Sequence, residues 1–242
     1  MNKSIMQSAF INHQSSIRNH QYLFRYTSGM TTSTVHAVLL VASGCAFCPK
    51  VHTALEDLHK QGRLASLEVI NVAEQPERAG EYGVRSVPWF KLNELEFTGV
   101  YTSAELEHWV NMAAHSDAVT EYLDHLLGDG QLNKAEQYLH RHPEHLPALL
   151  PLLTDEDRRI NVRIGVSALL EGLAGTTDLS SLVESLGRLS KHAQVSTRVD
   201  ACHYLSLTGS AGAKKYLQEA LQDEHPDVRE TAQESLVALE EG

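Results

Sequence analysis

Cys45 and Cys48 are separated by two residues and stand where an apolar run, residues 36–42, is followed by a stretch with helical spacing. At the start of a helix, free backbone N–H groups and the positive end of the helix dipole favour a thiolate. The thiolate is the nucleophile of disulfide exchange. We therefore expect Cys45 to attack a disulfide and Cys48, one turn further on, to resolve the mixed disulfide.

Other roles are open to such a pair. A structural zinc site needs four ligands, and the chain has no second C-x-x-C, so we expect no metal here. The pair could also belong to a redox-inactive module, although both cysteines are retained. Cys202 lies in an apolar helical stretch and is expected to be a buried structural residue.

The elements around the pair follow the order β-α-β-α-β-β-α. Apolar patterns predict strands over residues 36–42, 64–72, 87–92 and 95–100, and helices over 49–61, 74–82 and from 103 onward. Asn93 and Glu94 have the spacing of a two-residue hairpin turn, and Thr102 and Glu105 that of a capping box. The expected core residues are Val38, Leu39, Leu40, Leu67, Val69 and Phe90.

This order, the dithiol and the Val87-Pro88 pair before the third strand resemble the thioredoxin-like family, over residues 33–115. The resemblance implies an α/β thioredoxin-like fold with a cis Pro88 beside the dithiol. It also implies a substrate groove shaped by Val87, Pro88 and Phe47, in which the backbone of Val87 pairs with an extended peptide. We expect no bound cofactor.

The resemblance does not select one subfamily. Gly44 stands where thioredoxins have tryptophan, and Leu39 where they have a buried aspartate. Glutaredoxins have two glycines after the hairpin, where this chain has only Gly99. The reductant, thioredoxin reductase or glutathione, therefore stays open, and a glutathione-linked glutaredoxin is a third hypothesis.

Residues 116–242 show helical patterns only. Arg163, Arg198 and Arg229 are each followed by a small residue at +3 and a leucine at +7, with spacings of 35 and 31 residues. Apolar helical stretches precede each of them. Such units are typical of an all-α solenoid, and the last one resembles a HEAT repeat. An irregular helical bundle is the alternative, and residues 117–127 and 131–141 are expected to form a capping helix pair.

Charge and composition restrict the partners and the location. The chain has 242 residues and a net charge of −11, and residues 116–242 alone carry 11 basic and 21 acidic side chains. We expect no nucleic-acid partner, because such a surface repels phosphates. No run approaches the roughly 18 apolar residues of a membrane span. Three cysteines are typical of a reducing compartment, so we expect a cytoplasmic protein.

Residues 1–32 contain no acidic side chain. We interpret them as a disordered or non-native extension, with Met30 as an alternative start and an organellar transit peptide as the other possibility. The segment 41–45 resembles a lipoprotein cleavage site, but the apolar run before it is too short for an export signal.

His140, His142 and His145 cluster beside Pro143. We interpret them as a helix C-terminal turn, where partial positive charge is favourable, with a metal site as the alternative.

The sequence thus predicts a thiol–disulfide oxidoreductase acting on protein disulfides through Cys45 and Cys48, with a HEAT-like domain that docks a protein partner. The alternative is a redox-sensing or non-catalytic adaptor in which both domains mediate protein interactions.

Overall fold

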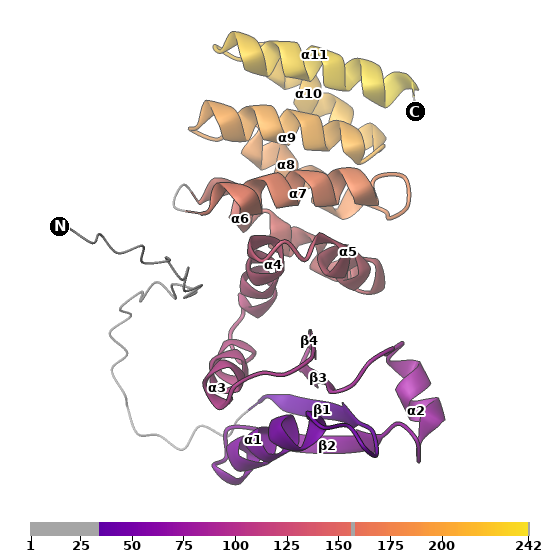
Figure 1. Cartoon of the computed structure of the whole chain (residues 1–242). Coiled ribbons are helices and arrows are strands. Elements are labelled where there is room, and N and C mark those ends of the chain that lie inside the picture. Colours follow the sequence, from indigo (N-terminus) through magenta and orange to yellow (C-terminus); the bar gives the residue numbers. More distant parts are fainter. Residues whose placement is uncertain (1–33, 156–157, 242) are drawn as a thin grey trace, which may run out of the picture. The chain divides into compact units, whose positions relative to one another are not determined.

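The structure, a computed structural model, describes residues 34–155 and 158–241, so the predicted extension 1–32 lies outside the described residues. The first part contains a four-stranded sheet in the order β2-β1-β3-β4 (Figure 1). The strands are β1 (His36–Val41), β2 (Ser66–Asn71), β3 (Trp89–Leu92) and β4 (Leu95–Thr98). β1 and β2 are parallel, and β3 is antiparallel to both of its neighbours.

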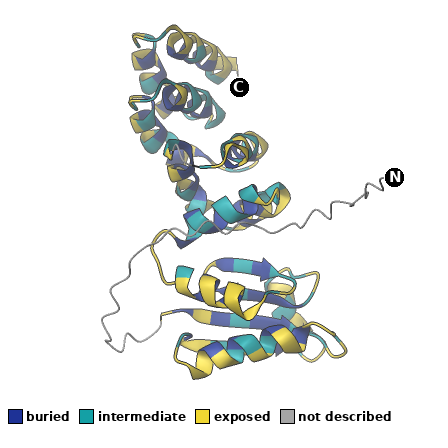
Figure 2. Cartoon of the chain, turned by 60° about the vertical axis from the view of Figure 1, so that its left-hand side comes forward, coloured by how far each residue is buried: buried dark blue, intermediate teal, exposed yellow. Residues whose placement is uncertain are grey.

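Helices cover both faces of this sheet. Helices α1 (Cys48–Lys60) and α3 (Ser103–Met112) pack on the face that contains Leu39 and Phe90, both 0% exposed. Helix α2 (Pro76–Glu81) lies on the opposite face, over a smaller cluster around Leu40 and Trp89. Leu39 and Leu40 are neighbours in β1 but lie on opposite faces of the sheet, because side chains alternate along a strand. Figure 2 shows the buried positions concentrated on the strands and on the inner sides of the helices. The predicted fold is confirmed.

The predicted core is wrong at one position. Leu39, Leu40 and Phe90 are buried as expected, and Val38 and Leu67 are half-buried, but Val69 is 37% exposed. β2 is an edge strand with a neighbouring strand on one side only, so fewer residues pack over its side chains. Ile70, on the opposite face of the same strand, is buried at 1% exposure.

The predicted hairpin is present, with shorter strands. Asn93 has a φ of 51°, as a tight two-residue turn requires. β3 begins after Pro88, which has no backbone N–H for a ladder hydrogen bond. β4 ends before Gly99, whose φ of 101° is incompatible with a continuing strand.

Thr102 and Glu105 form the predicted capping box at the start of α3. The Thr102 hydroxyl accepts a hydrogen bond from the backbone N–H of Glu105 at 3.2 Å, and the Glu105 carboxylate accepts one from the backbone N–H of Thr102 at 2.7 Å. Thr102→Ala should lower the free energy of unfolding by about 1 kcal/mol, because it leaves the backbone N–H of Glu105 without its side-chain acceptor. Urea unfolding measures this, and the exposed neighbour Ser103→Ala is the control.

The capping box should also depend on pH. The Glu105 carboxylate accepts hydrogen bonds from the backbone N–H and the hydroxyl of Thr102, and these bonds hold the pKa of Glu105 below its usual value. A carboxyl with a depressed folded pKa stabilises the protein above its unfolded pKa, about 4.3, and loses that contribution as the pH falls through the folded pKa. The difference between wild type and Thr102→Ala should therefore shrink below about pH 4. A difference that stays constant down to pH 3 would contradict this electrostatic part of the cap.

The second part of the chain is helical. Its elements in the described residues are α4 (Ala118–Gly128), α5 (Leu132–Arg141), η1 (Pro143–Leu149), α6 (Pro151–Thr154), α7 (Ile160–Leu173), η2 (Ser180–Leu182), α8 (Val183–Leu189), α9 (Val195–Leu207), η3 (Ala211–Ala213), α10 (Lys214–Ala220) and α11 (Pro226–Glu241). After the pair α4 and α5, a 3-10 turn, a short helix and a long helix recur three times. The long helices α7, α9 and α11 lie side by side (Figure 1). None of the helices in the described part of the chain has the length and apolar character needed to cross a membrane.

The repeated residues occupy equivalent places in these units. The small residues and leucines of the sequence pattern, namely Val166, Ala201, Ala232, Leu170, Leu205 and Leu236, are all buried. Arg198 donates to the carbonyls of the residues six and five positions earlier, at 3.0 and 3.1 Å. Arg229 makes the same two contacts, at 2.7 and 2.9 Å. These two arginines thus fasten the turn that precedes their own helix, whereas Arg163 pairs with Asp200 of α9 at 2.9 Å.

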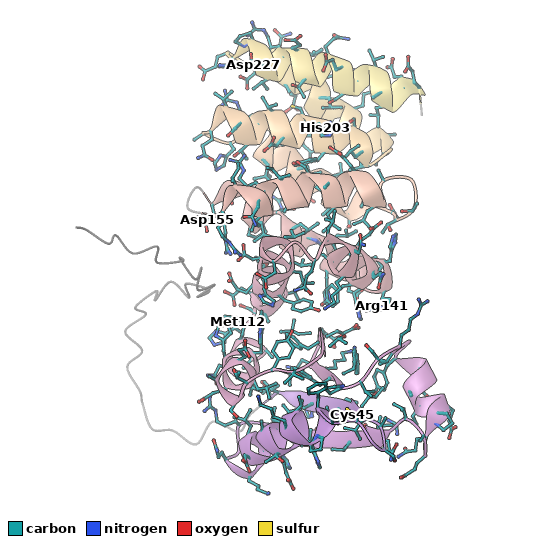
Figure 3. The ribbon with its side chains drawn as sticks, viewed as in Figure 1. Cys45, Met112, Arg141, Asp155, His203 and Asp227 are labelled. Carbon is teal, nitrogen blue, oxygen red and sulfur yellow. A yellow bond between two sulfur atoms is a disulfide. The ribbon has the colours of Figure 1, made fainter. Side chains whose placement is uncertain are left out.

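The helix pair α4 and α5 packs against the edge strand β4. The hydroxyl of Tyr122 donates to the backbone carbonyl of Glu96, and Arg141, labelled in Figure 3, pairs with the Glu96 carboxylate. The ring of Phe97 contacts that of Tyr122 with centroids 5.3 Å apart. The apolar core therefore continues from the sheet into the helices. The domain division between residues 115 and 116 stays a prediction.

Candidate dithiol site

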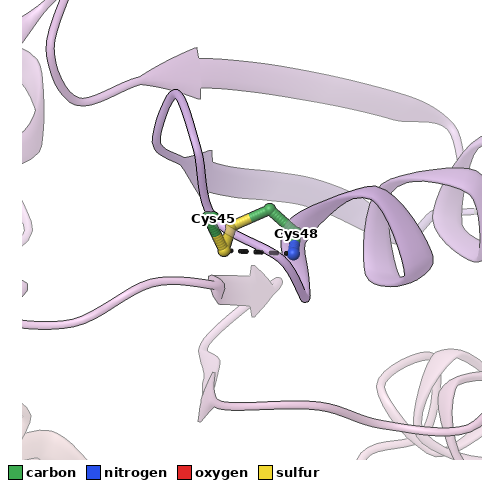
Figure 4. The surroundings of a disulfide bond; sticks show 2 residues. All are labelled: Cys45 and Cys48. Carbon is green, nitrogen blue, oxygen red and sulfur yellow. Dashed lines mark hydrogen bonds between the residues drawn. A yellow bond between two sulfur atoms is a disulfide. The ribbon is translucent and has the colours of Figure 1, made fainter.

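Cys45 and Cys48 form a disulfide at the start of α1, with their Cα atoms 5.5 Å apart (Figure 4). The loop that leaves β1 turns at Gly44, whose φ of 82° is readily adopted only by glycine. The backbone N–H of Cys45 then donates to the carbonyl of Ala42 at 3.2 Å, which closes the turn. The strand, the turn and the helix together place both sulfur atoms at one end of the sheet.

The two sulfur atoms have different surroundings. Cys48 is 3% exposed, whereas Cys45 is only half-buried. The backbone N–H of Cys48 donates to Sγ of Cys45 at 3.1 Å, shown as the dashed line in Figure 4. The first turn of α1 contains no acidic residue. In the reduced state, this N–H and the helix N-terminus favour negative charge on the more accessible sulfur.

Val87 and Pro88 lie at the same end of the sheet. The antiparallel register pairs Leu40 of β1 with Trp89 of β3, so Pro88 falls beside the end of β1 that continues to Cys45. The Val87–Pro88 peptide bond is cis. The carbonyl of Pro88 accepts a hydrogen bond from Gly99 at 2.9 Å. Within the described residues, no hydrogen bond engages the backbone N–H or C=O of Val87.

Phe47 is the third predicted substrate residue. It lies between the two cysteines as the residue that precedes α1, and its side chain is 61% exposed. The structure thus brings Cys45, Cys48 and Phe47 together, and places Val87 and Pro88 at the same sheet end.

Leu39 lies in the core between the sheet and helix α1. It is 0% exposed and belongs to the apolar cluster shared with α1, so the strand offers no carboxylate at this position. Lys50, in the first turn of α1, is exposed.

A groove that sequence reasoning missed begins two residues before Pro88. It has a volume of about 540 Å³ and lies between residues 82–86, the sheet and helices α4 and α5. Arg85 and Lys134 are exposed cations on its walls, and neither has an ion pair within the described residues. No sequence signal could have found this groove, because its walls come from segments almost fifty residues apart.

Cys202 is apart from this site. It is buried in α9, as predicted, and burial raises the pKa of its thiol to about 11. It is therefore protonated and inaccessible at neutral pH, which makes it a matched control for the dithiol.

Comparisons with known proteins agree with the two parts of the fold. Residues 36–111 match a family model described as Thioredoxin domain, and residues 215–242 match one described as HEAT repeat. A thioredoxin of Methanocaldococcus jannaschii is 33% identical over 76 residues, which are 31% of this chain and 89% of that protein. Both resemblances predicted from the sequence are confirmed.

Proposed function

Because the chain belongs to the thioredoxin family, we propose that it is a thiol–disulfide oxidoreductase that acts on protein disulfides through Cys45 and Cys48. The observation that carries the proposal is the asymmetry of the pair. Cys45 is accessible and receives a hydrogen bond from the helix N-terminus, whereas Cys48 is buried beside it. This is the arrangement that an attacking and a resolving cysteine need.

The reaction consists of two exchanges. The Cys45 thiolate attacks one sulfur of the substrate disulfide, forms a mixed disulfide and expels the other substrate sulfur as a thiolate, which takes up a proton. The Cys48 thiol, on losing its proton, attacks Sγ of Cys45, releases the second substrate thiol and leaves the Cys45–Cys48 disulfide. The substrate gains two electrons and two protons. A reductant, thioredoxin reductase or glutathione, then restores the dithiol.

Binding of the substrate chain falls to the residues around the sulfurs. The free backbone groups of Val87 hold an extended peptide by strand-like pairing, Pro88 shapes the groove, and the exposed ring of Phe47 contacts an apolar side chain. The helical part docks the partner protein. In support of docking, Ile160 and Ile164 lie one turn apart on α7 and are 70% and 62% exposed.

The test is catalysis of disulfide reduction by the full chain. We expect catalytic amounts to accelerate the reduction of insulin disulfides by dithiothreitol, followed as turbidity. Cys202→Ala should be as active as wild type, because the buried thiol takes no part. Coupling to thioredoxin reductase or to glutathione and glutathione reductase would then identify the reductant. No acceleration with any reductant would contradict the enzyme and favour the adaptor.

The adaptor is the second proposal, and the size of the helical part favours it. The described residues from α4 to α11 contain no part of the dithiol site, yet this helical part is larger than the thioredoxin-like part. In this version the helices bind a client protein, and the Cys45–Cys48 pair reports the redox state without turnover.

A further inference from the structure

His142, Glu144 and His145 form a compact cluster at the turn where α5 ends and η1 begins. One donor atom from each residue lies within 4.8 Å of the other two. His142 is largely buried, with a side chain 17% exposed, whereas the Glu144 side chain is 64% exposed. The cluster thus has one side set into the protein and one side open to solvent.

The spacing inside the cluster suits a shared metal ion. Nδ1 of His142 and Oε1 of Glu144 are 3.4 Å apart, a long contact that both atoms can exchange for bonds to one ion. Two ligands bound tetrahedrally to Zn²⁺ at about 2.0–2.1 Å are separated by about 3.3–3.4 Å. This pair therefore already has the separation of two zinc ligands.

Each histidine is also held through its other ring nitrogen. Nε2 of His142 lies 3.3 Å from a carboxylate oxygen of Glu96 on β4. Nδ1 of His145 lies 2.8 Å from the hydroxyl of Tyr138 on α5. Partners of this kind orient a metal-binding imidazole and select the tautomer that presents its free nitrogen to the ion. The cluster therefore has both the donors and the groups that support them.

We propose that His142, Glu144 and His145 bind one Zn²⁺ ion, with Nδ1 of His142, a carboxylate oxygen of Glu144 and Nε2 of His145 as ligands. Two imidazoles and one carboxylate are a donor set that zinc prefers, and the fourth position is left for water on the solvent side. The site is separate from the dithiol. Through Glu96 it ties the turn after α5 to strand β4.

Zinc binding by the full chain tests this proposal. The parent for the test is Cys45→Ser/Cys48→Ser, because a reduced dithiol itself binds zinc. Titration with ZnCl₂ in a calorimeter should give one tight site per chain. Glu144→Gln removes an exposed donor without disturbing the core and should weaken this site at least about 100-fold, and His145→Ala should do the same. Glu96→Gln alters only a supporting group and should cost about 10–100-fold.

His140→Ala is the matched control. His140 lies two residues from the cluster on α5, but its Nδ1 is bonded to the hydroxyl of Thr177 at 2.8 Å. Its replacement should leave zinc affinity unchanged. Zinc should raise the melting temperature of the parent and of His140→Ala, but not that of Glu144→Gln. No stoichiometric binding by the parent, or equal affinity in the parent and Glu144→Gln, would overturn the proposal.

Discussion

Replacing Cys48 by serine should accumulate a mixed disulfide between Cys45 and a substrate protein, and replacing Cys45 by serine should abolish both this complex and disulfide reduction. The reason is the asymmetry of the site. Cys45 can attack without its partner, but only the buried Cys48 can release the bound substrate. Non-reducing electrophoresis of cell lysates, followed by mass spectrometry, measures the complexes and identifies the trapped proteins.

Cys48→Ser/Cys202→Ala should trap the same proteins as Cys48→Ser, because burial keeps the Cys202 thiol protonated and out of reach. Cys45→Ser/Cys48→Ser should trap none. Complexes that persist in this double variant, or insulin reduction by Cys45→Ser at the wild-type rate, would refute the assignment of Cys45 as the attacking residue.

Arg198→Leu should lower the free energy of unfolding by about 3–5 kcal/mol, the largest expected effect of a single substitution in the helical part. Its guanidinium is 7% exposed and holds the Asp223 carboxylate through two bonds of 2.8 and 2.9 Å. The same side chain donates to two backbone carbonyls in the turn between α8 and α9. Leucine at position 198 would leave the two backbone carbonyls without their donor. It would also leave the carboxylate of Asp223, which is only 13% exposed, without a positive partner.

Urea unfolding followed by circular dichroism measures this loss. Arg188→Leu is the control. Arg188 forms an ion pair with Glu184, and because their side chains are 66% and 80% exposed, the pair contributes at most about 0.5 kcal/mol. Arg198→Leu/Asp223→Leu should recover part of the loss, since no charge is then left buried. Arg198 also holds the pKa of Asp223 below its usual value, so the part of its contribution that comes from Asp223 should be present at neutral pH and be lost as the pH falls below about 4 and through the folded pKa. A loss under 1 kcal/mol at pH 7 would contradict this role.

Much of the fold could be predicted because it depends on local chemistry. The hairpin at Asn93, the cap at Thr102 and the helix start at Cys48 each depend on a few adjacent residues whose side chains satisfy or free backbone groups. The burial of the repeated residues from Val166 to Leu236 follows from helical periodicity alone. The exposure of Val69 could not be predicted in this way, because an edge strand and a central strand have similar sequences.

The sequence by itself determined the dithiol, its place at a helix start, and the division of the chain into an α/β part and a repetitive helical part. The tertiary structure decided which sulfur is accessible, how Val87 and Pro88 come to the sheet end that holds the dithiol, and that Arg85 and Lys134 share a groove. It also decided that His142 meets Glu96, 46 residues earlier in the chain. The physical reason is range: backbone hydrogen bonding and side-chain periodicity act over a few residues, whereas these sites depend on strand register and helix packing between distant segments.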